Sequence, residues 1–181
     1  MELITRRERK PAPGFMYETS ASLSLCGKYR YSLGRRWDRA LPMLVFIMLN
    51  PSTADARVDD ATIRRCVAFA KRDNYGAVLV HNLFALRATK PKALWLSPDP
   101  IGPDNDLHLS KLAGWAGTIV CAWGVQQHPK FMERARHVVH NLRASPAVER
   151  LHCLGTTKEG HPRHPLYLSK ETEIEEWNGG K

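Results

Sequence analysis

Four apolar runs of this sequence are each followed directly by a short segment that could contact a ligand. Strands would end at these segments. The four segments are Asn50-Pro51-Ser52-Thr53, Asn82-Leu83-Phe84, Trp123-Gly124 and Gly155-Thr156-Thr157. The amides of Asn50 and Asn82 each offer a hydrogen-bond donor and an acceptor, so they can orient a water or bind the edge of a base. Pro51 stiffens its turn, and the hydroxyls of Ser52 and Thr53 add polar contacts. A plainer interpretation is that these segments are turns that only end their strands.

Two histidines near the C-terminus, His161 and His164, are the best candidates for an acid or an electrophile, because His titrates near neutral pH. They lie in a Gly-His-Pro-Arg-His-Pro segment, whose prolines constrain a loop. His81 lies inside an apolar run and is interpreted as structural. Asp59 is a further candidate for substrate binding, although Asp59 and Asp60 are also adequately explained as caps of the following helix.

The charge balance favours a polyanionic partner. Lys and Arg number 27 against 18 Asp and Glu, a net charge of +9, and the excess is concentrated early in the chain. We therefore expect a polyanionic partner, nucleic acid above all, and no membrane. A basic protein without such a partner is the alternative. The candidate nucleic-acid contacts are Arg30, Arg35, Arg36, Arg87, Lys90 and Arg163.

Aromatic side chains could complete the binding site by stacking on a base. Trp95 and Trp123 are the two that could do so, and Phe84 and Trp123 are among the candidate substrate-binding residues. The competing interpretation, that a tryptophan in a sheet-based domain packs in the core, applies to Trp123 and also to Trp95.

Several classes of protein are disfavoured by the sequence. The four cysteines contain no CxxC pair, which argues against a zinc or iron–sulfur site, and we expect neither metal nor cofactor. No apolar run approaches the roughly 18 residues of a membrane span. The N-terminus has no apolar stretch typical of a secretory signal. We expect a soluble, cytoplasmic protein with reduced thiols.

Apolar runs and helical patterns alternate along the chain. Strands are expected at 42–49, 77–82, 118–123 and 148–154, helices at 61–72, 104–115 and 129–142, and a β-hairpin at 21–33. This alternation predicts a three-layer α/β/α fold, with a central, mainly parallel four-stranded sheet and an N-terminal β-hairpin. Ligands of such sheets lie beyond the carboxyl ends of the strands. The predicted organisation is a basic flexible arm or edge segment at 1–14, one domain at 15–175 and a tail at 176–181.

Together, the motifs resemble a bacterial and phage family known only as a domain of unknown function, number sixteen forty-three. The motifs are Leu49-Asn50-Pro51-Ser52-Thr53-Ala54, Asp59-Asp60-x-Thr62-x-Arg64-Arg65-Cys66, Asn82-Leu83-Phe84-Ala85-x-Arg87-Ala88-Thr89, Ile101-Gly102-Pro103-x-Asn105-Asp106, Ala122-Trp123-Gly124 and the run from His161 to Leu168. The resemblance spans roughly residues 20 to 170.

More distantly, the order of these motifs is similar to that of the uracil-DNA glycosylase superfamily. The resemblance implies that Asn50-Pro51 matches the turn that positions the hydrolytic water, in the Asn form of the mismatch-specific branch. It implies that Asn82 reads the flipped base. It also implies that His164, or else His161, stabilises the charge that develops on the leaving base. The implied reaction is base flipping followed by cleavage of the N-glycosidic bond.

This sequence departs from the glycosylase pattern at positions that bear on the target base. Leu49 stands where a small residue is usual, and no aromatic residue follows Pro51 to wall a uracil pocket. We therefore expect a modified or damaged base as the target. The alternatives are a non-catalytic nucleic-acid-binding module on the same fold, and a hydrolase or transferase that acts on small nucleotides.

Overall fold

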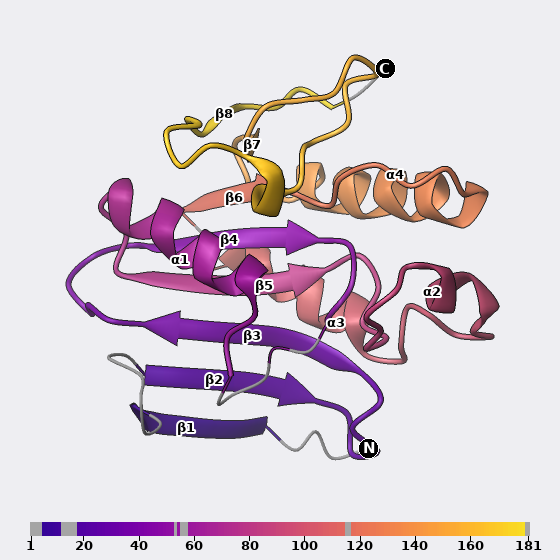
Figure 1. Ribbon diagram of the computed structural model, residues 1–181, viewed down its shortest axis with the longest axis horizontal. Coiled ribbons are helices and arrows are strands. Elements are labelled where there is room, and N and C mark those ends of the chain that lie inside the picture. Colours follow the sequence, from indigo (N-terminus) through magenta and orange to yellow (C-terminus); the bar gives the residue numbers. More distant parts are fainter. Residues whose placement is uncertain (1–4, 12–17, 53, 55–57, 115–116, 180–181) are drawn as a thin grey trace.

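The computed structural model of the chain describes residues 5–11, 18–52, 54, 58–114 and 117–179. Within these residues, eight strands form one mixed sheet in the order β1-β2-β3-β5-β4-β6-β7-β8 (Figure 1). The strands are β1 (Thr5–Pro11), β2 (Glu18–Leu23), β3 (Arg30–Arg36), β4 (Met43–Met48), β5 (Ala77–Asn82), β6 (Thr118–Cys121), β7 (Leu151–Cys153) and β8 (Glu175–Glu176).

The centre of the sheet is parallel. β4 pairs in parallel with β5 on one side and with β6 on the other, and β6 pairs in parallel with β7. These are the four strands that the apolar runs predicted. β4 and β5 are buried along nearly their whole length, as strands covered on both faces must be.

The sheet is larger than predicted. β2 and β3 form the expected hairpin, but β3 also pairs antiparallel with β5, so the hairpin belongs to the central sheet. This pairing covers an edge of β5 that would otherwise present unpaired backbone groups. β1 pairs with β2, which makes Thr5–Pro11 an edge strand within the segment predicted as an arm.

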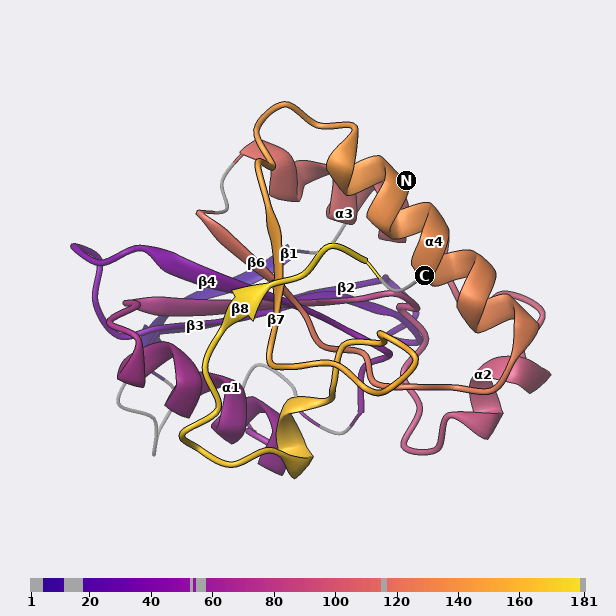
Figure 2. The same cartoon turned by 90° about the horizontal axis from the view of Figure 1, so that it is seen from above.

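Helices cover both faces of the sheet (Figure 2). α1 lies on one face, and α3 and α4 lie on the other. The helices are α1 (Ala61–Arg72), α2 (Lys92–Leu96), α3 (Asn105–Ser110) and α4 (Pro129–Arg143), with short 3-10 turns η1 (Lys111–Gly114) and η2 (Pro165–Tyr167). α1 has the predicted bounds. The helix predicted at 104–115 is instead α3 followed by η1, and α2 lies between the predicted strand at 77–82 and that helix, where no element was predicted. No helix in the described ranges is long and apolar enough to cross a membrane.

Each face of the sheet has its own apolar core, because side chains alternate along the strands. Val45 and Ile47 of β4 pack in the cluster that includes Phe131 of α4, whereas Phe46 packs in the cluster that includes Phe69 of α1. Trp177 belongs to the α4-side core. The fold therefore continues past residue 175, where the domain was predicted to end.

The strand order fixes where a site can form. After β4 the chain crosses to β5 on one side, and the next parallel strand, β6, is added on the other side. Loops leaving the carboxyl ends of β4 and β6 therefore diverge to opposite faces, and the crevice between them is the usual ligand position in such sheets.

Candidate active site

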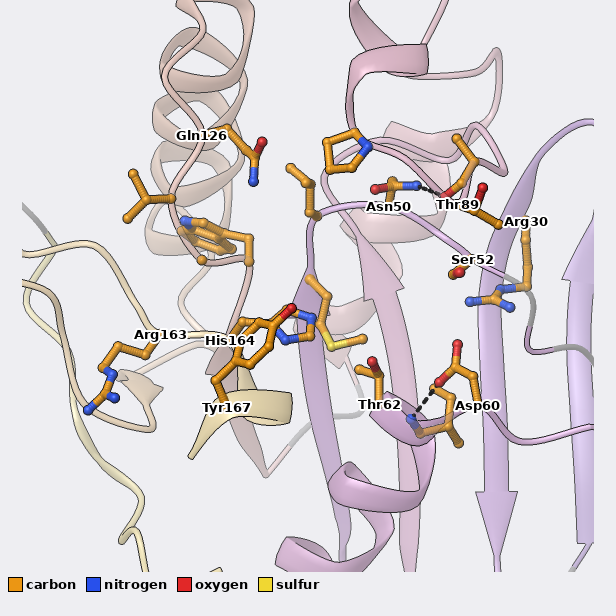
Figure 3. Close-up of a pocket in the computed structure, with 18 of the residues that line it drawn as sticks. Arg30, Asn50, Ser52, Asp60, Thr62, Thr89, Gln126, Arg163, His164 and Tyr167 are labelled. Carbon is orange, nitrogen blue, oxygen red and sulfur yellow. Dashed lines mark hydrogen bonds between the residues drawn. The ribbon is translucent and has the colours of Figure 1, made fainter. Parts of the chain in front are cut away.

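A cavity of about 430 Å³ opens in this crevice (Figure 3). Its volume lies within the range of roughly 300–1,000 Å³ that is usual for small-molecule sites. The residues that line it are Arg30, Met48, Leu49, Asn50, Ser52, Asp60, Thr62, Ile63, Ala88, Thr89, Pro91, Trp123, Gly124, Val125, Gln126, Thr157, Arg163, His164 and Tyr167. They come from the ends of β4 and β6, from the loops after β5 and β7, from β3 and from the start of α1. Three of the four predicted strand-end segments therefore contribute to the cavity, and the Asn82-Leu83-Phe84 segment does not.

Asn50 presents an oxygen to this cavity. Its side-chain nitrogen donates hydrogen bonds to the carbonyl oxygens of Pro51, at 2.9 Å, and Ala88, at 2.7 Å. Both amide hydrogens are therefore used within the protein, and Oδ1 remains as a hydrogen-bond acceptor. Figure 3 shows the amide nitrogen turned toward the loop that carries Thr89 and the oxygen turned the other way. Ser52 lines the same wall, whereas Thr53 lies outside the described residues.

His164 is held as a hydrogen-bond donor to the cavity. Its Nδ1 accepts a hydrogen bond from the backbone N–H of Leu166 at 3.3 Å, which caps η2. The proton of the neutral ring must then be on Nε2. Burial lowers the pKa of His164, an effect that the Asp60 carboxylate opposes. His164 is consequently uncharged at neutral pH. Its Nε2–H can donate a hydrogen bond that stabilises negative charge.

The structure separates the two candidate histidines. His161 does not line the cavity; its ring lies 6.2 Å from that of Phe131, between ring centroids. The backbone of His161 exchanges hydrogen bonds with Thr157, which closes a turn. The sequence pattern is nearly the same around both residues, so only the fold could distinguish them.

The two predicted aromatic residues have different positions. Trp123 lines the cavity and packs edge-to-face on Trp177, with ring centroids 5.4 Å apart. Phe84 is fully buried and does not line the cavity; it packs edge-to-face against Trp95. Phe84 therefore belongs to the core of the domain.

Asn82 lies beneath the cavity wall. It is 1% exposed, and neither its side-chain oxygen nor its nitrogen has a hydrogen-bond partner. Asn82 is paired in register with Met48, which lines the cavity, so the two side chains are neighbours on one face of the sheet. Asn82 itself does not line the cavity.

The adjacent aspartates at the start of α1 have separate roles. Asp59, the predicted binding residue, forms a buried ion pair with Arg35 at 2.8 Å. Asp60 lines the cavity and caps α1, because its Oδ1 accepts the N–H of Ile63 at 2.9 Å. The sequence indicated that one of them would cap the helix. It gave no sign that the capping residue would be the one to face a ligand.

Two of the six predicted nucleic-acid contacts line the cavity. Arg30 is buried in its wall and donates to the carbonyl of Ala54, and Arg163 is exposed at its rim. Arg87 and Lys90 are exposed outside it. Arg35 is buried in its ion pair with Asp59. Arg36 is paired with Ala77, the first residue of β5, and thus lies at the opposite end of the strands.

The cavity also contains polar residues that were not predicted as site residues, notably Thr62, Thr89, Gln126 and Tyr167. Their common property is position, since each lies in a loop or helix start next to a predicted strand end. Among the described residues, no group of three or more His, Cys, Asp and Glu side chains could hold a metal ion.

These observations define a mixed α/β domain with a cavity of mixed polar and apolar lining at the switch point of its parallel strands. The chain belongs to the family described as "Protein of unknown function (DUF1643)", whose sequence model matches residues 30–166. The matched range contains the cavity wall from Arg30 to His164. No curated protein and no solved structure matches the chain.

Proposed function

We propose that this protein hydrolyses the N-glycosidic bond of a modified or damaged base in DNA. The observation that carries the proposal is the pairing, within one cavity, of the Asn50 oxygen with the Nε2–H donor of His164. The acceptor can orient a water, and the donor can stabilise an anionic leaving base. Both contribute to hydrolysis of an N-glycosidic bond.

The cavity rim supports a nucleic-acid substrate. Tyr167 is 81% exposed at the rim, and its neighbour Leu166 and the rim residue Val125 are exposed as well. Exposed apolar side chains are unfavourable in water but can pack against bases that have lost a stacking partner. Arg163 adds a cation for the phosphate backbone at the same rim.

The test is incubation with DNA that carries a panel of modified bases, uracil included, followed by scoring of abasic sites. We expect the wild type to release at least one base. The variants Asn50→Ala and His164→Ala should each lose about 10²-fold or more in rate. His161→Ala is the matched control and should retain activity, because His161 lies outside the cavity. Absence of base release across the panel would refute the proposal, and equal losses in the two histidine variants would refute the role given to His164.

A second candidate, a hydrolase or transferase of free nucleotides, is favoured by the burial of Arg30 and Arg35. The Arg30 cation in the cavity wall suits a small anionic ligand that enters the cavity. The Arg35 cation is buried in its ion pair and cannot contact a duplex. The dependence of binding on salt separates the candidates. Duplex binding through several phosphates gives a steep fall in affinity with salt, whereas a mononucleotide gives a shallow one. Tight duplex binding with no base release would indicate a binding module.

A further inference from the structure

Hydrolysis in this cavity requires a group that accepts a proton from the attacking water. Asn50 cannot do so, since an amide oxygen is a hydrogen-bond acceptor but a very weak base. His164 is also unsuited, because its Nδ1 already accepts the Leu166 N–H and its Nε2 carries the ring proton. Ser52, Thr62 and the other hydroxyl residues have no basic atom at neutral pH.

Asp60 is the carboxylate among the described residues that line the cavity. One of its oxygens accepts the Ile63 N–H, which fixes the side chain at the start of α1. Figure 3 shows the second oxygen turned away from the helix, toward Ser52. The adjacent Asp59 forms a buried ion pair with Arg35, so contacts of both aspartates hold the turn in place.

We propose that Asp60 is the general base that takes the proton from the hydrolytic water, an inference that rests on the proposed glycosylase function. The water oxygen forms a bond to the sugar C1′, and the C1′–N bond breaks with its electron pair leaving on the base. One water proton passes to the second Asp60 oxygen. The base anion accepts a hydrogen bond from His164 Nε2 and is then protonated by solvent.

This assignment explains how the turn after β4 can carry Asn50, whose amide oxygen is too weak a base to accept the water proton. Asn50 supplies only a hydrogen-bond acceptor, and the negative charge that the reaction needs comes from a residue ten positions later in the sequence. The carboxylate also lies close enough to oppose the effect of burial on the pKa of His164.

The decisive variant is Asp60→Asn. Asn caps helices about as well as Asp, so the bond to Ile63 N–H and the fold are retained while the basic oxygen is lost. We expect the single-turnover rate of base release to fall about 10²-fold or more, with DNA affinity and thermal midpoint close to those of the wild type. Asp73→Asn removes a carboxylate just past the opposite end of α1 and should leave the rate unchanged.

Chemical rescue distinguishes a base from a positioning residue. Added formate should partly restore the rate of Asp60→Ala. If Asp60→Asn keeps the wild-type rate while Asn50→Ala is inactive, the glycosylase proposal stands and the role of Asp60 is refuted. If the wild type releases no base, both are refuted.

Discussion

Gly124 shows how one residue shapes the wall that holds His164. It follows β6 with a φ of +71°, a conformation that L side chains rarely adopt, and a Cβ there would lie 3.5 Å from the Cβ of His164. Its N–H donates to the carbonyl of Pro162, which ties the histidine loop to the sheet. A contact of that length is ordinary, so space does not exclude a Cβ. The glycine is required for its left-handed backbone conformation.

We predict that Gly124→Ala lowers the free energy of unfolding by about 1–2 kcal/mol, the cost of left-handed backbone for a residue with a Cβ. Urea denaturation would measure the change. Gly117→Ala is the control and should be near neutral, since nothing lies within 4 Å of a Cβ at that position. Equal effects of the two substitutions would show that the Gly124 backbone is not constrained.

Asp59 and Asp60 are adjacent, yet the structure predicts different costs for their loss. Asp59→Ala leaves Arg35 buried without its carboxylate and should destabilise the protein by about 3–5 kcal/mol. Asp60→Ala removes a helix cap and should cost about 1 kcal/mol. Thermal denaturation of both variants would measure this order. The opposite order would mean that Arg35 finds another partner.

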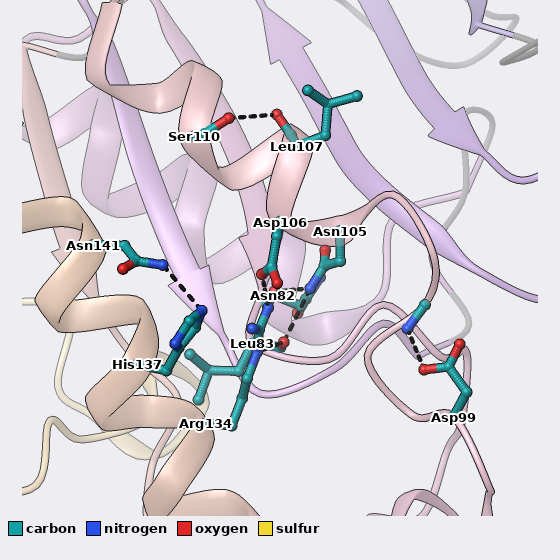
Figure 4. Close-up of polar contacts among 11 residues, drawn as sticks. Asn82, Leu83, Asp99, Asn105, Asp106, Leu107, Ser110, Arg134, His137 and Asn141 are labelled. Carbon is teal, nitrogen blue, oxygen red and sulfur yellow. Dashed lines mark hydrogen bonds and ion pairs between the residues drawn. The ribbon is translucent and has the colours of Figure 1, made fainter.

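At the scale of elements, a polar network holds the turn after β5 (Figure 4). Asn105 Nδ2 donates to the carbonyl oxygens of Asn82, at 3.1 Å, and Leu83, at 2.9 Å. Arg134 Nε donates to the Leu83 carbonyl at 2.8 Å and pairs with Asp106. The start of α3 and the side of α4 are thereby fixed to the strand that carries Asn82.

We predict that Asn105→Ala lowers the free energy of unfolding by about 1–3 kcal/mol, because the Asn82 carbonyl is left without this donor in a buried site. Chemical denaturation would measure it. Ser110→Ala, at the exposed end of α3, removes one hydrogen bond to the Leu107 carbonyl and should have little effect. Similar losses in both variants would argue against a structural role for the network.

The elements that could be predicted from sequence are those with a local cause. β4 and β5 are continuous apolar runs, and α1 combines a capping aspartate with an amphipathic pattern. The pairing of β3 with β5 could not be predicted, because the two strands are separated by β4 and α1 and their contact is decided by the whole sheet. The break between α3 and η1 was missed for a similar reason, since it follows from packing.

At the scale of the molecule, the position of the site could be predicted from the sequence. Which residues line it could be predicted only in part. Parallel strands bring their carboxyl ends together, so Asn50, Trp123 and His164 were expected in one crevice and do line one cavity. Whether a strand-end residue faces the cavity or the core depends on register and on neighbouring side chains. Asn82 is beneath the wall for that reason, and Asp60 rather than Asp59 faces the cavity.

The stability of the whole fold should depend on pH through His81. This residue is fully enclosed in β5, and burial, with a smaller contribution from the nearby His108, lowers its pKa to about 3. The unfolded chain regains an ordinary His pKa of about 6.5, so between these two values the unfolded state binds more protons than the folded state. The free energy of unfolding must then fall as the pH is lowered through this window.

We therefore predict that between pH 7 and pH 4.5 the wild type loses about 2–3 kcal/mol of stability that a His81→Leu variant keeps, since a buried leucine has no proton to bind. Urea denaturation at a series of pH values would measure the two slopes. The difference should vanish above pH 7, where His81 is neutral in both the folded and the unfolded state. Identical slopes below pH 6 would show that His81 gains a proton in the folded protein without penalty, and thus that its site is hydrated or opens readily.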